Sequence, residues 1–226
     1  MKAMILAAGL GTRMGALTRT LPKPLLAVNG RPLIVHLVEA LAAAGLRELV
    51  VNLAYRGEQI EAALGDGTAL GVRIDYSREP DGPLGTGGGV LRALPLLGPA
   101  PFVLVNADVH SGYPFGALPR RPAGLAHLVL VDNPDHNPGG DFALADDARV
   151  ANPRVTNEEA GRLTFAGISV IDPALLAGHA GPDSFSLTPL LRAAADRGLV
   201  SGEHYPGPWL DVGTPQRLAA AQQPPC

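Results

Sequence analysis

The sequence predicts an α/β protein with a Rossmann-like central sheet, mixed but mostly parallel, that is flanked by helices. Two observations predict this fold. Short apolar runs typical of buried strands alternate with stretches of helical periodicity through the first hundred residues. Glycine-rich or acidic segments follow several of these runs, where the strands of a parallel sheet end on one edge. The chain has 226 residues, 46% of them hydrophobic, which suits one large domain and argues against disorder.

Charge and composition exclude several classes of partner. The formal net charge is −3, so no global positive field draws the chain to nucleic acid or to an anionic membrane. The apolar run Met4–Ala8 is too short for a signal peptide, and no uncharged apolar stretch approaches the length of a membrane-spanning helix. The single cysteine, Cys226, cannot form an internal disulfide. These features favour a protein of the cytoplasm and leave its oligomeric state open.

The first strand and the turn after it predict a phosphate site. Met4–Ala8 forms a buried strand that ends in the turn Gly9–Arg13. Glycine lets the backbone approach a ligand closely, Thr12 offers a hydroxyl, and Arg13 offers a charged planar fork for phosphate oxygens. Lys23, held between two prolines, adds a second cation. The segment matches neither the dinucleotide-binding fingerprint nor the P-loop, and a turn that only connects two elements is the alternative.

The alternation of elements continues beyond this turn. Pro32 suits the first turn of a helix, and Gly45 suits the position just after its end. This order of strands and helices is typical of a parallel sheet with helices on both faces, whose ligands bind at the carboxyl ends of the strands. The pattern predicts, in order, a helix over 33–44, a strand over 49–53, a helix over 57–64 and a strand over 72–76.

A second candidate for the same edge is Asp108. It follows a strand whose apolar residues begin at Phe102. A carboxylate beside a phosphate site is a hard oxygen ligand of the kind that Mg²⁺ prefers, whereas the alternative is an aspartate that only caps the next loop. Ahead of this strand, the glycine loop 83–89 precedes a helix that begins at Val90. That loop either exposes its backbone to a flat ring or a phosphate, or is a flexible turn.

The second half of the chain adds strands, a polar loop and a capped helix. Gly167, inside a strand, indicates the close approach of a ligand or of backbone. Near the end, Asp211 precedes Thr214, which caps a helix ahead of Pro215. The pattern predicts strands over 125–131 and 163–171, a turn-rich loop over 132–142, a turn and mobile excursion over 146–162, and helices beginning at Asp172 and spanning 186–197.

Together these motifs resemble those of sugar-1-phosphate nucleotidyltransferases, over nearly the whole chain. The resemblance implies a GT-A-like nucleotidyltransferase fold in a single domain over 1–226, with a nucleotide-binding half at about 1–110 and a sugar-binding half at about 111–226. The loop that contains Asn133-Pro-x-His136 and Gly-Asp141-Phe is similar to that of N-acetylmuramate-1-phosphate uridylyltransferases within this family. The motifs that carry the resemblance are Gly9-x-Gly-Thr-Arg-Met, Leu17-Thr18, Pro22-Lys23-Pro24, the Thr-Gly-Gly segment at Thr86, and Trp209-x-Asp-Val-Gly-Thr-Pro.

The resemblance also implies roles for individual residues. Arg13 and Lys23 are the implied catalytic residues, and Asp108 and Asp211 the implied ligands of Mg²⁺. His136 is either a sugar contact or a solvated loop residue. The implied nucleotide-binding residues are Ala8, Gly9, Gly11, Thr12, Arg13, Lys23, Thr86, Gly87, Gly88 and Asn106, and the implied sugar-binding residues are Asn133, Asp141 and Gly167.

The implied reaction joins a sugar 1-phosphate to a nucleoside triphosphate and releases pyrophosphate. The specific expectation is UTP and N-acetylmuramate 1-phosphate as substrates, a step of peptidoglycan recycling. Guanylyl transfer to mannose 1-phosphate and thymidylyl transfer to glucose 1-phosphate stay open, as does a nucleotide-sugar-binding module without catalysis. A dinucleotide-dependent oxidoreductase is disfavoured, because Asn52 and Leu53 stand where a ribose-binding acid is needed.

Overall fold

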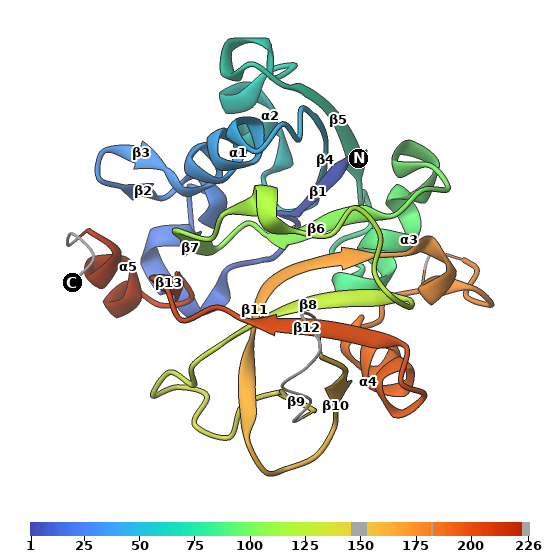
Figure 1. Cartoon of the computed structure of the whole chain (residues 1–226). Helices are drawn as coiled ribbons and strands as arrows, with labels where there is room; N and C mark the ends of the chain where they lie inside the picture. The colour runs from blue at the N-terminus through green and yellow to red at the C-terminus, as the bar shows by residue number, and fades with distance from the viewer. Residues whose placement is uncertain (146–152, 182, 223–226) are drawn as a thin grey trace.

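A computed structural model describes residues 1–145, 153–181 and 183–222 (Figure 1). Within these residues, a mixed nine-stranded sheet forms the centre of the molecule. Its main path runs β10-β9-β11-β6-β1-β4-β5, and β8 pairs with β11 and β12. The strands are β1 (Ala3–Leu6), β4 (Glu48–Leu53), β5 (Arg73–Arg78), β6 (Phe102–Asn106), β8 (Ala126–Val131), β9 (Phe142–Leu144), β10 (Val155–Thr156), β11 (Arg162–Ile171) and β12 (Val200–His204).

The first four strands of the main sheet form a parallel block. β1 lies between β4 and β6, β4 pairs with β5, and all three pairings are parallel. The registers place Leu6 opposite both Asn52 and Asn106, so the carboxyl ends of three strands share one edge. β11 then pairs antiparallel with β6 and β8. The predicted fold class, a Rossmann-like mixed sheet flanked by helices, is confirmed.

Helices cover both faces of this sheet. The helices α1 (Leu33–Ala43) and α2 (Gly57–Leu64) pack on the face that contains Ile5 and Val51, whereas α3 (Gly85–Leu97) and α4 (Thr188–Asp196) pack on the face of Met4 and Val50. Neighbouring strand residues thus enter opposite cores, because side chains alternate along a strand. Burial on both faces explains why the parallel strands read as continuous apolar runs. None of the described helices is long and apolar enough to cross a membrane.

A small antiparallel pair brings the end of the chain to the sheet edge. β13 (Trp209–Asp211) pairs with β7 (Val109–Ser111), which places Asp211 opposite Val109. The amide of Val212 also donates to the carbonyl of Asp108 at 2.8 Å. After β13, Val212 and Ala221 of the helix α5 (Pro215–Ala221) pack with Val28 of the hairpin formed by β2 (Ala27–Val28) and β3 (Arg31–Pro32). In Figure 1 the helix α5 and this hairpin lie on the same side of the molecule.

Several boundaries differ from the sequence prediction. The glycines of 83–89 are not all loop, since α3 already begins at Gly85. The helix expected at Asp172 is a single 3₁₀ turn, Pro173–Leu176, although Asp172 does cap it by accepting from the Ala174 amide at 2.9 Å. The short strands β2, β3, β7, β9, β10 and β12 were not expected. Cys226 and part of the predicted turn over 146–162 lie outside the described residues.

Candidate active site

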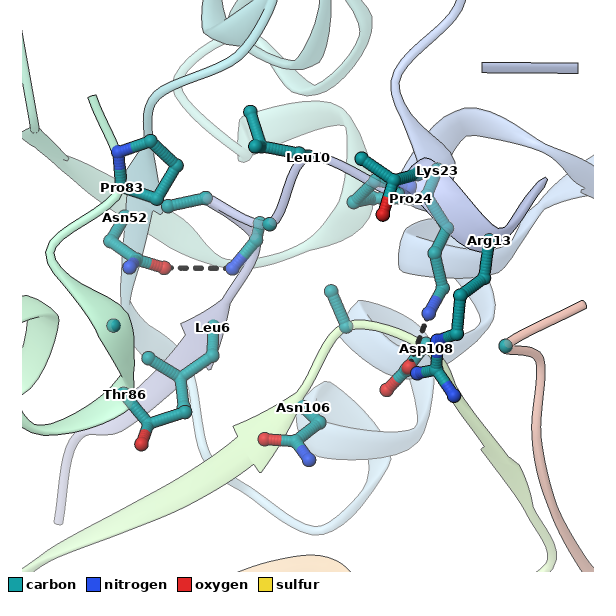
Figure 2. Close-up of a pocket in the computed structure, with 18 residues that line it drawn as sticks. Leu6, Leu10, Arg13, Lys23, Pro24, Asn52, Pro83, Thr86, Asn106 and Asp108 are labelled. Atoms are coloured by element: carbon teal, nitrogen blue, oxygen red, sulfur yellow. Dashed lines mark hydrogen bonds and ion pairs between the residues drawn. The ribbon is translucent and has the colours of Figure 1, made fainter. Parts of the chain in front are cut away.

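A cavity of about 420 Å³ opens at the carboxyl ends of β1 and β6. The turn after β1, the loop before Pro24 and the first residues of α3 form its walls (Figure 2). The predicted nucleotide-binding residues in its lining are Ala8, Gly9, Gly11, Thr12, Arg13, Lys23, Thr86 and Asn106, and Asp108 lines it too. The sheet topology therefore brings together residues from three separate parts of the sequence.

The turn after β1 is shaped by Gly11. Its φ of +65° lies in the left-handed region that favours glycine, and its carbonyl accepts from the Met14 amide at 2.9 Å and from the Thr18 hydroxyl at 2.9 Å. A Cβ at Gly11 would stand 3.2 Å from the Cβ of Lys23. Gly11 thus starts the 3₁₀ segment Thr12–Thr18, which is kinked at Gly15 and leaves Arg13 exposed beside the cavity.

Lys23 and Asp108 form an ion pair across the floor of the cavity (Figure 2). Their side chains are 14% and 20% exposed, so both are open to a ligand while shielded from bulk water. Pro22 fixes the entry to the short turn Lys23–Leu25, and Pro24 is buried. A charge pair in such a site is screened less by salt than a surface pair, so the attraction between Lys23 and Asp108 persists at high ionic strength.

A buried hydrogen-bonded network is centred on Asn52, which lines the cavity. Asn52 Oδ1 accepts from the Ala7 amide at 2.7 Å, and Asn52 Nδ2 donates to Glu79 Oε1 at 2.7 Å. Glu79 Oε2 accepts from the Leu84 amide at 2.8 Å. Asn52 and Glu79 are 2% and 3% exposed, and Gly89 faces both, since a Cβ there would stand within 3 Å of each. The sequence reasoning missed this network, which joins the phosphate turn to the loop before α3.

Asp211 lies at the border between this cavity and a second one. Its Oδ1 accepts from Arg217 Nη1 at 2.8 Å and lies 3.0 Å from His136 Nε2. Burial raises the pKa of the Asp211 carboxyl above its ordinary value of 3.8, and the nearby Asp108 adds to this, whereas Arg217 and His136 oppose it. Asp108 affects this pKa because it is close in space: Asp211 pairs with Val109, the residue next to Asp108.

The second cavity, of about 300 Å³, lies on the β11 side. Asp141 and Gly167, both predicted to bind sugar, line it together with His136 and Arg13. Gly167 has a φ of +71°, and a Cβ there would stand 2.6 Å from Asn106 Nδ2. The glycine within the strand thus admits the Asn106 side chain, which is the close approach that its position predicts.

A hydrogen-bonded cluster fixes the polar loop on this cavity. Asp141 Oδ2 accepts from the Phe165 amide at 2.9 Å and from Asn137 Nδ2 at 3.2 Å. Asn137 Nδ2 also donates to Thr164 Oγ1 at 3.1 Å, and Asn137 and Thr164 both line the cavity. Asn137 was not predicted as a site residue, although its place in the polar loop was.

Three predicted site residues lie elsewhere. Gly87 and Gly88 are buried, and their amides donate to the carbonyl of Phe185 at 2.9 and 3.3 Å. A Cβ on Gly87 would stand 2.2 Å from the Phe185 ring, so these glycines let the segment before α4 pack against the start of α3. Asn133 donates to the Arg162 carbonyl at 2.8 Å and accepts from Thr164. Among the described residues that line the two cavities, none of the three is found.

Asp108 and Asp211 have the chemistry of a hard divalent cation site. Two carboxylates at one edge, beside a cavity with room for phosphate oxygens and water, suit an ion that takes few protein ligands. In the described part of the chain, no group of three or more His, Cys, Asp or Glu side chains is placed to hold a metal. A cation here would depend on ligands from the bound substrate.

Comparison with known proteins identifies relatives over the full length of the chain. A family model described as "Nucleotidyl transferase" matches residues 2–140. The chain is 49% identical to the N-acetylmuramate alpha-1-phosphate uridylyltransferase of Neisseria meningitidis, covering 98% of this chain and 97% of that protein. It is 37% identical to the Caulobacter vibrioides protein of the same name (97% and 95%) and 36% identical to the mannose-1-phosphate guanyltransferase of Aspergillus fumigatus (96% and 62%).

A solved structure shares the fold. A chain from Bacillus anthracis, described as a glucose-1-phosphate thymidylyltransferase in complex with a sucrose, superposes with a TM-score of 0.83 at 20% identity, covering 98% of this chain and 94% of that one. At this identity the likeness supports the architecture alone. The resemblance drawn from the sequence motifs is confirmed by the family model and the curated relatives, and the chain belongs to the nucleotidyl transferase family.

Proposed function

We propose that the protein joins N-acetylmuramate 1-phosphate to UTP, giving UDP-N-acetylmuramate and pyrophosphate. The observation that carries this proposal is the near full-length identity of 49% to a relative named for that activity. The juxtaposition of Arg13, Lys23, Asp108 and Asp211 around two adjoining cavities supports it. We assign the nucleotide to the cavity that contains Gly9 and the sugar to the cavity that contains Asp141.

The reaction calls for charge neutralisation more than for acid–base chemistry. A sugar-phosphate oxygen is already an anion, so it attacks the α-phosphorus of UTP without a general base, and the bond to the β-phosphate oxygen breaks as pyrophosphate leaves. Two polyanions must approach each other, and fixed positive charges lower the energy of that approach. The protein's part is to place such charges and to align the two phosphates.

We assign this role to Lys23 and Arg13. We assign Lys23 to the α-phosphate and the incoming sugar phosphate, because its ammonium group lies beside Asp108 where the two cavities meet. We assign Arg13 to the β- and γ-phosphates, since this exposed residue lines both cavities and its fork suits phosphate oxygens. Gly9 and Gly11 leave the backbone of this turn open to the close approach of the triphosphate.

Asp108 and Asp211 would hold the cation, which we take to be Mg²⁺. When bound, Mg²⁺ supplies positive charge at the α-phosphate. The two carboxylates would hold this charge close to Lys23, which pairs with Asp108. Asn106, at the end of β6 and packed against Gly167, is a further candidate for contact with the nucleotide. We assign an indirect role to Asn133, Gly87 and Gly88, which hold the loops around the site in place.

The remaining assignments follow from this reaction. UTP and a sugar phosphate are the partners, and we place the reaction in the cytoplasm, where UTP is found, as a step of peptidoglycan recycling. The chain also has relatives named as mannose-1-phosphate guanyltransferases, so guanylyl transfer is the second candidate. A panel of sugar 1-phosphates against UTP, GTP and dTTP separates the two: we expect product only from UTP with N-acetylmuramate 1-phosphate, and no turnover of that pair would refute the proposal.

A further inference from the structure

Arg217 reaches back from the first turn of α5 to the carboxylate of Asp211. Its Nη1 donates to Asp211 Oδ1 at 2.8 Å, and its side chain is only 13% exposed. Among the described residues, the buried Nε of Arg217 has no hydrogen-bond partner. Burial and a single short contact fix this guanidinium to one carboxylate, which sets it apart from an arginine on a solvated surface.

The local backbone explains how the side chain reaches its target. Thr214 caps α5 by accepting from the Arg217 amide at 3.3 Å, which fixes the first turn. Gly213 lies between Arg217 and Arg13: a Cβ there would stand 2.1 Å from Arg217 Nη2 and 3.4 Å from Arg13 Nη2. Gly213 also lines the nucleotide cavity. The absence of a side chain at Gly213 thus makes room for two guanidinium groups from opposite ends of the sequence.

The side-chain contacts of Asp211 fall on one of its two carboxylate oxygens. Within the described part of the chain, Arg217 and His136 both contact Oδ1. This leaves Oδ2 as the oxygen that can ligate a cation shared with Asp108. Groups that hydrogen-bond to the distal atoms of a metal ligand fix its orientation and raise the affinity of the site.

We propose that Arg217 is a positioning residue for the metal site: by holding Asp211 Oδ1, it orients Oδ2 toward a divalent cation. Its permanent charge also offsets the repulsion between Asp211 and Asp108, which share one sheet edge. The inference rests on the proposed function in one respect, since it takes Asp211 to be a metal ligand. It adds a residue outside the predicted set of phosphate-binding cations and metal ligands.

Direct binding of Mn²⁺ tests this assignment without a sugar substrate. The affinity of the full chain for Mn²⁺ is measured by electron paramagnetic resonance in the presence of UTP, for the wild type, R217Q, R217K and D108N. We expect R217Q to weaken Mn²⁺ binding about tenfold, with R217K intermediate and D108N at least as weak as R217Q. R197Q, an exposed arginine at the end of α4, serves as the matched control and should bind as the wild type does.

The same variants give a second readout in turnover. R217Q should require about tenfold more Mg²⁺ for half-maximal activity, while the KM for UTP at saturating Mg²⁺ changes less than threefold. A merely structural role would lower thermal stability without moving the Mg²⁺ requirement. Wild-type Mn²⁺ affinity in a folded R217Q would overturn the proposal.

G213A keeps the test decisive if R217Q does not fold. The new Cβ displaces the Arg217 guanidinium without removing its charge, and Gly213 does not have a positive φ that would strain alanine. We expect weaker Mn²⁺ binding here too, and unchanged affinity would contradict the proposal. Failure of the proposed function would give a different result. A wild-type enzyme that turns over another sugar phosphate refutes the proposed substrate, whereas the comparison of Mn²⁺ affinities still decides the role of Arg217.

Discussion

Asn52 and Glu79 meet in a 2.7 Å hydrogen bond that is almost wholly buried behind the phosphate turn. The pair links β4 to the loop after β5, and each residue also receives a backbone amide, from Ala7 and from Leu84. All four partners are therefore held in one network that crosses the wall of the nucleotide cavity. Such a network is stabilising only while every member is satisfied.

Replacing Glu79 by glutamine should break this network. The amide group of glutamine must point its NH₂ at one of two donors, Asn52 Nδ2 or the Leu84 amide, so one buried donor loses its acceptor. We expect E79Q to lower the free energy of unfolding by about 1–3 kcal/mol, measured by urea denaturation. E159Q, at an exposed glutamate, is the control, and equal stability of the two variants would contradict the account.

Lys23 should be needed for turnover and not for folding. Lys23→Met keeps much of the side-chain volume and removes the charge beside Asp108. We expect kcat to fall about 100- to 1000-fold, because a fixed charge at the reacting phosphates is lost. Lys23→Arg, which keeps the charge, should recover part of the activity. A Lys23→Met enzyme with wild-type kcat and an unchanged melting temperature would show that Lys23 does not act on the substrates.

The glycines of the site separate into two kinds that mutation can distinguish. A Cβ on Gly9 would meet nothing within 4 Å, so G9A should leave stability unchanged and weaken UTP binding from the cavity side. G87A would collide with the Phe185 ring and should lower the free energy of unfolding by about 1–3 kcal/mol. Isothermal calorimetry with UTP and urea denaturation measure the two effects. The distinction is wrong if G9A destabilises the protein as much as G87A.

The Glu203 carboxyl makes the free energy of unfolding depend on pH in the acidic range. The nearby His127, whose Nε2 lies 3.8 Å from Glu203 Oε1, lowers the pKa of the Glu203 carboxyl below its ordinary value of 4.5. A hydrogen bond donated by the Tyr113 hydroxyl acts in the same direction, although burial opposes this. Because the folded pKa is the lower one, the stabilisation is fully present above about pH 4.5 and is lost as pH falls below it. The stability difference between wild type and E203Q should therefore shrink below pH 4.5, as followed by denaturant midpoints. A difference that widens on acidification would contradict this.

Much of the fold could be predicted from local patterns. The helix over 57–64 has the predicted bounds, and the buried strands at β4, β6 and β8 match to within a few residues. These elements are set by apolar periodicity and by glycine or proline at their ends. β12 could not be predicted in this way, because its sequence Val-Ser-Gly-Glu-His is mostly polar and its burial depends on pairing with β8.

The site residues also divide into those that local patterns predict and those that only the tertiary structure reveals. The motifs predicted Arg13, Lys23, Asp108 and Asp211 as site residues, and all four line the two adjoining cavities. Each belongs to a short motif that can be recognised along the sequence. Arg217 was missed, since its contact depends on how the chain turns back across Gly213, and no spacing rule describes that path. The amides of Gly87 and Gly88 are held by a carbonyl nearly a hundred residues away, which only the tertiary structure reveals.

The most direct test of the central claim is a ³¹P NMR time course of the purified protein with UTP, N-acetylmuramate 1-phosphate and Mg²⁺. The account predicts that the signals of both substrates fall together, while those of a nucleotide diphosphate sugar and of pyrophosphate rise in equal amounts. The Lys23→Met variant, run in parallel, should give neither product at a comparable rate. No pyrophosphate from the wild type, or faster conversion of mannose 1-phosphate with GTP, would contradict the account.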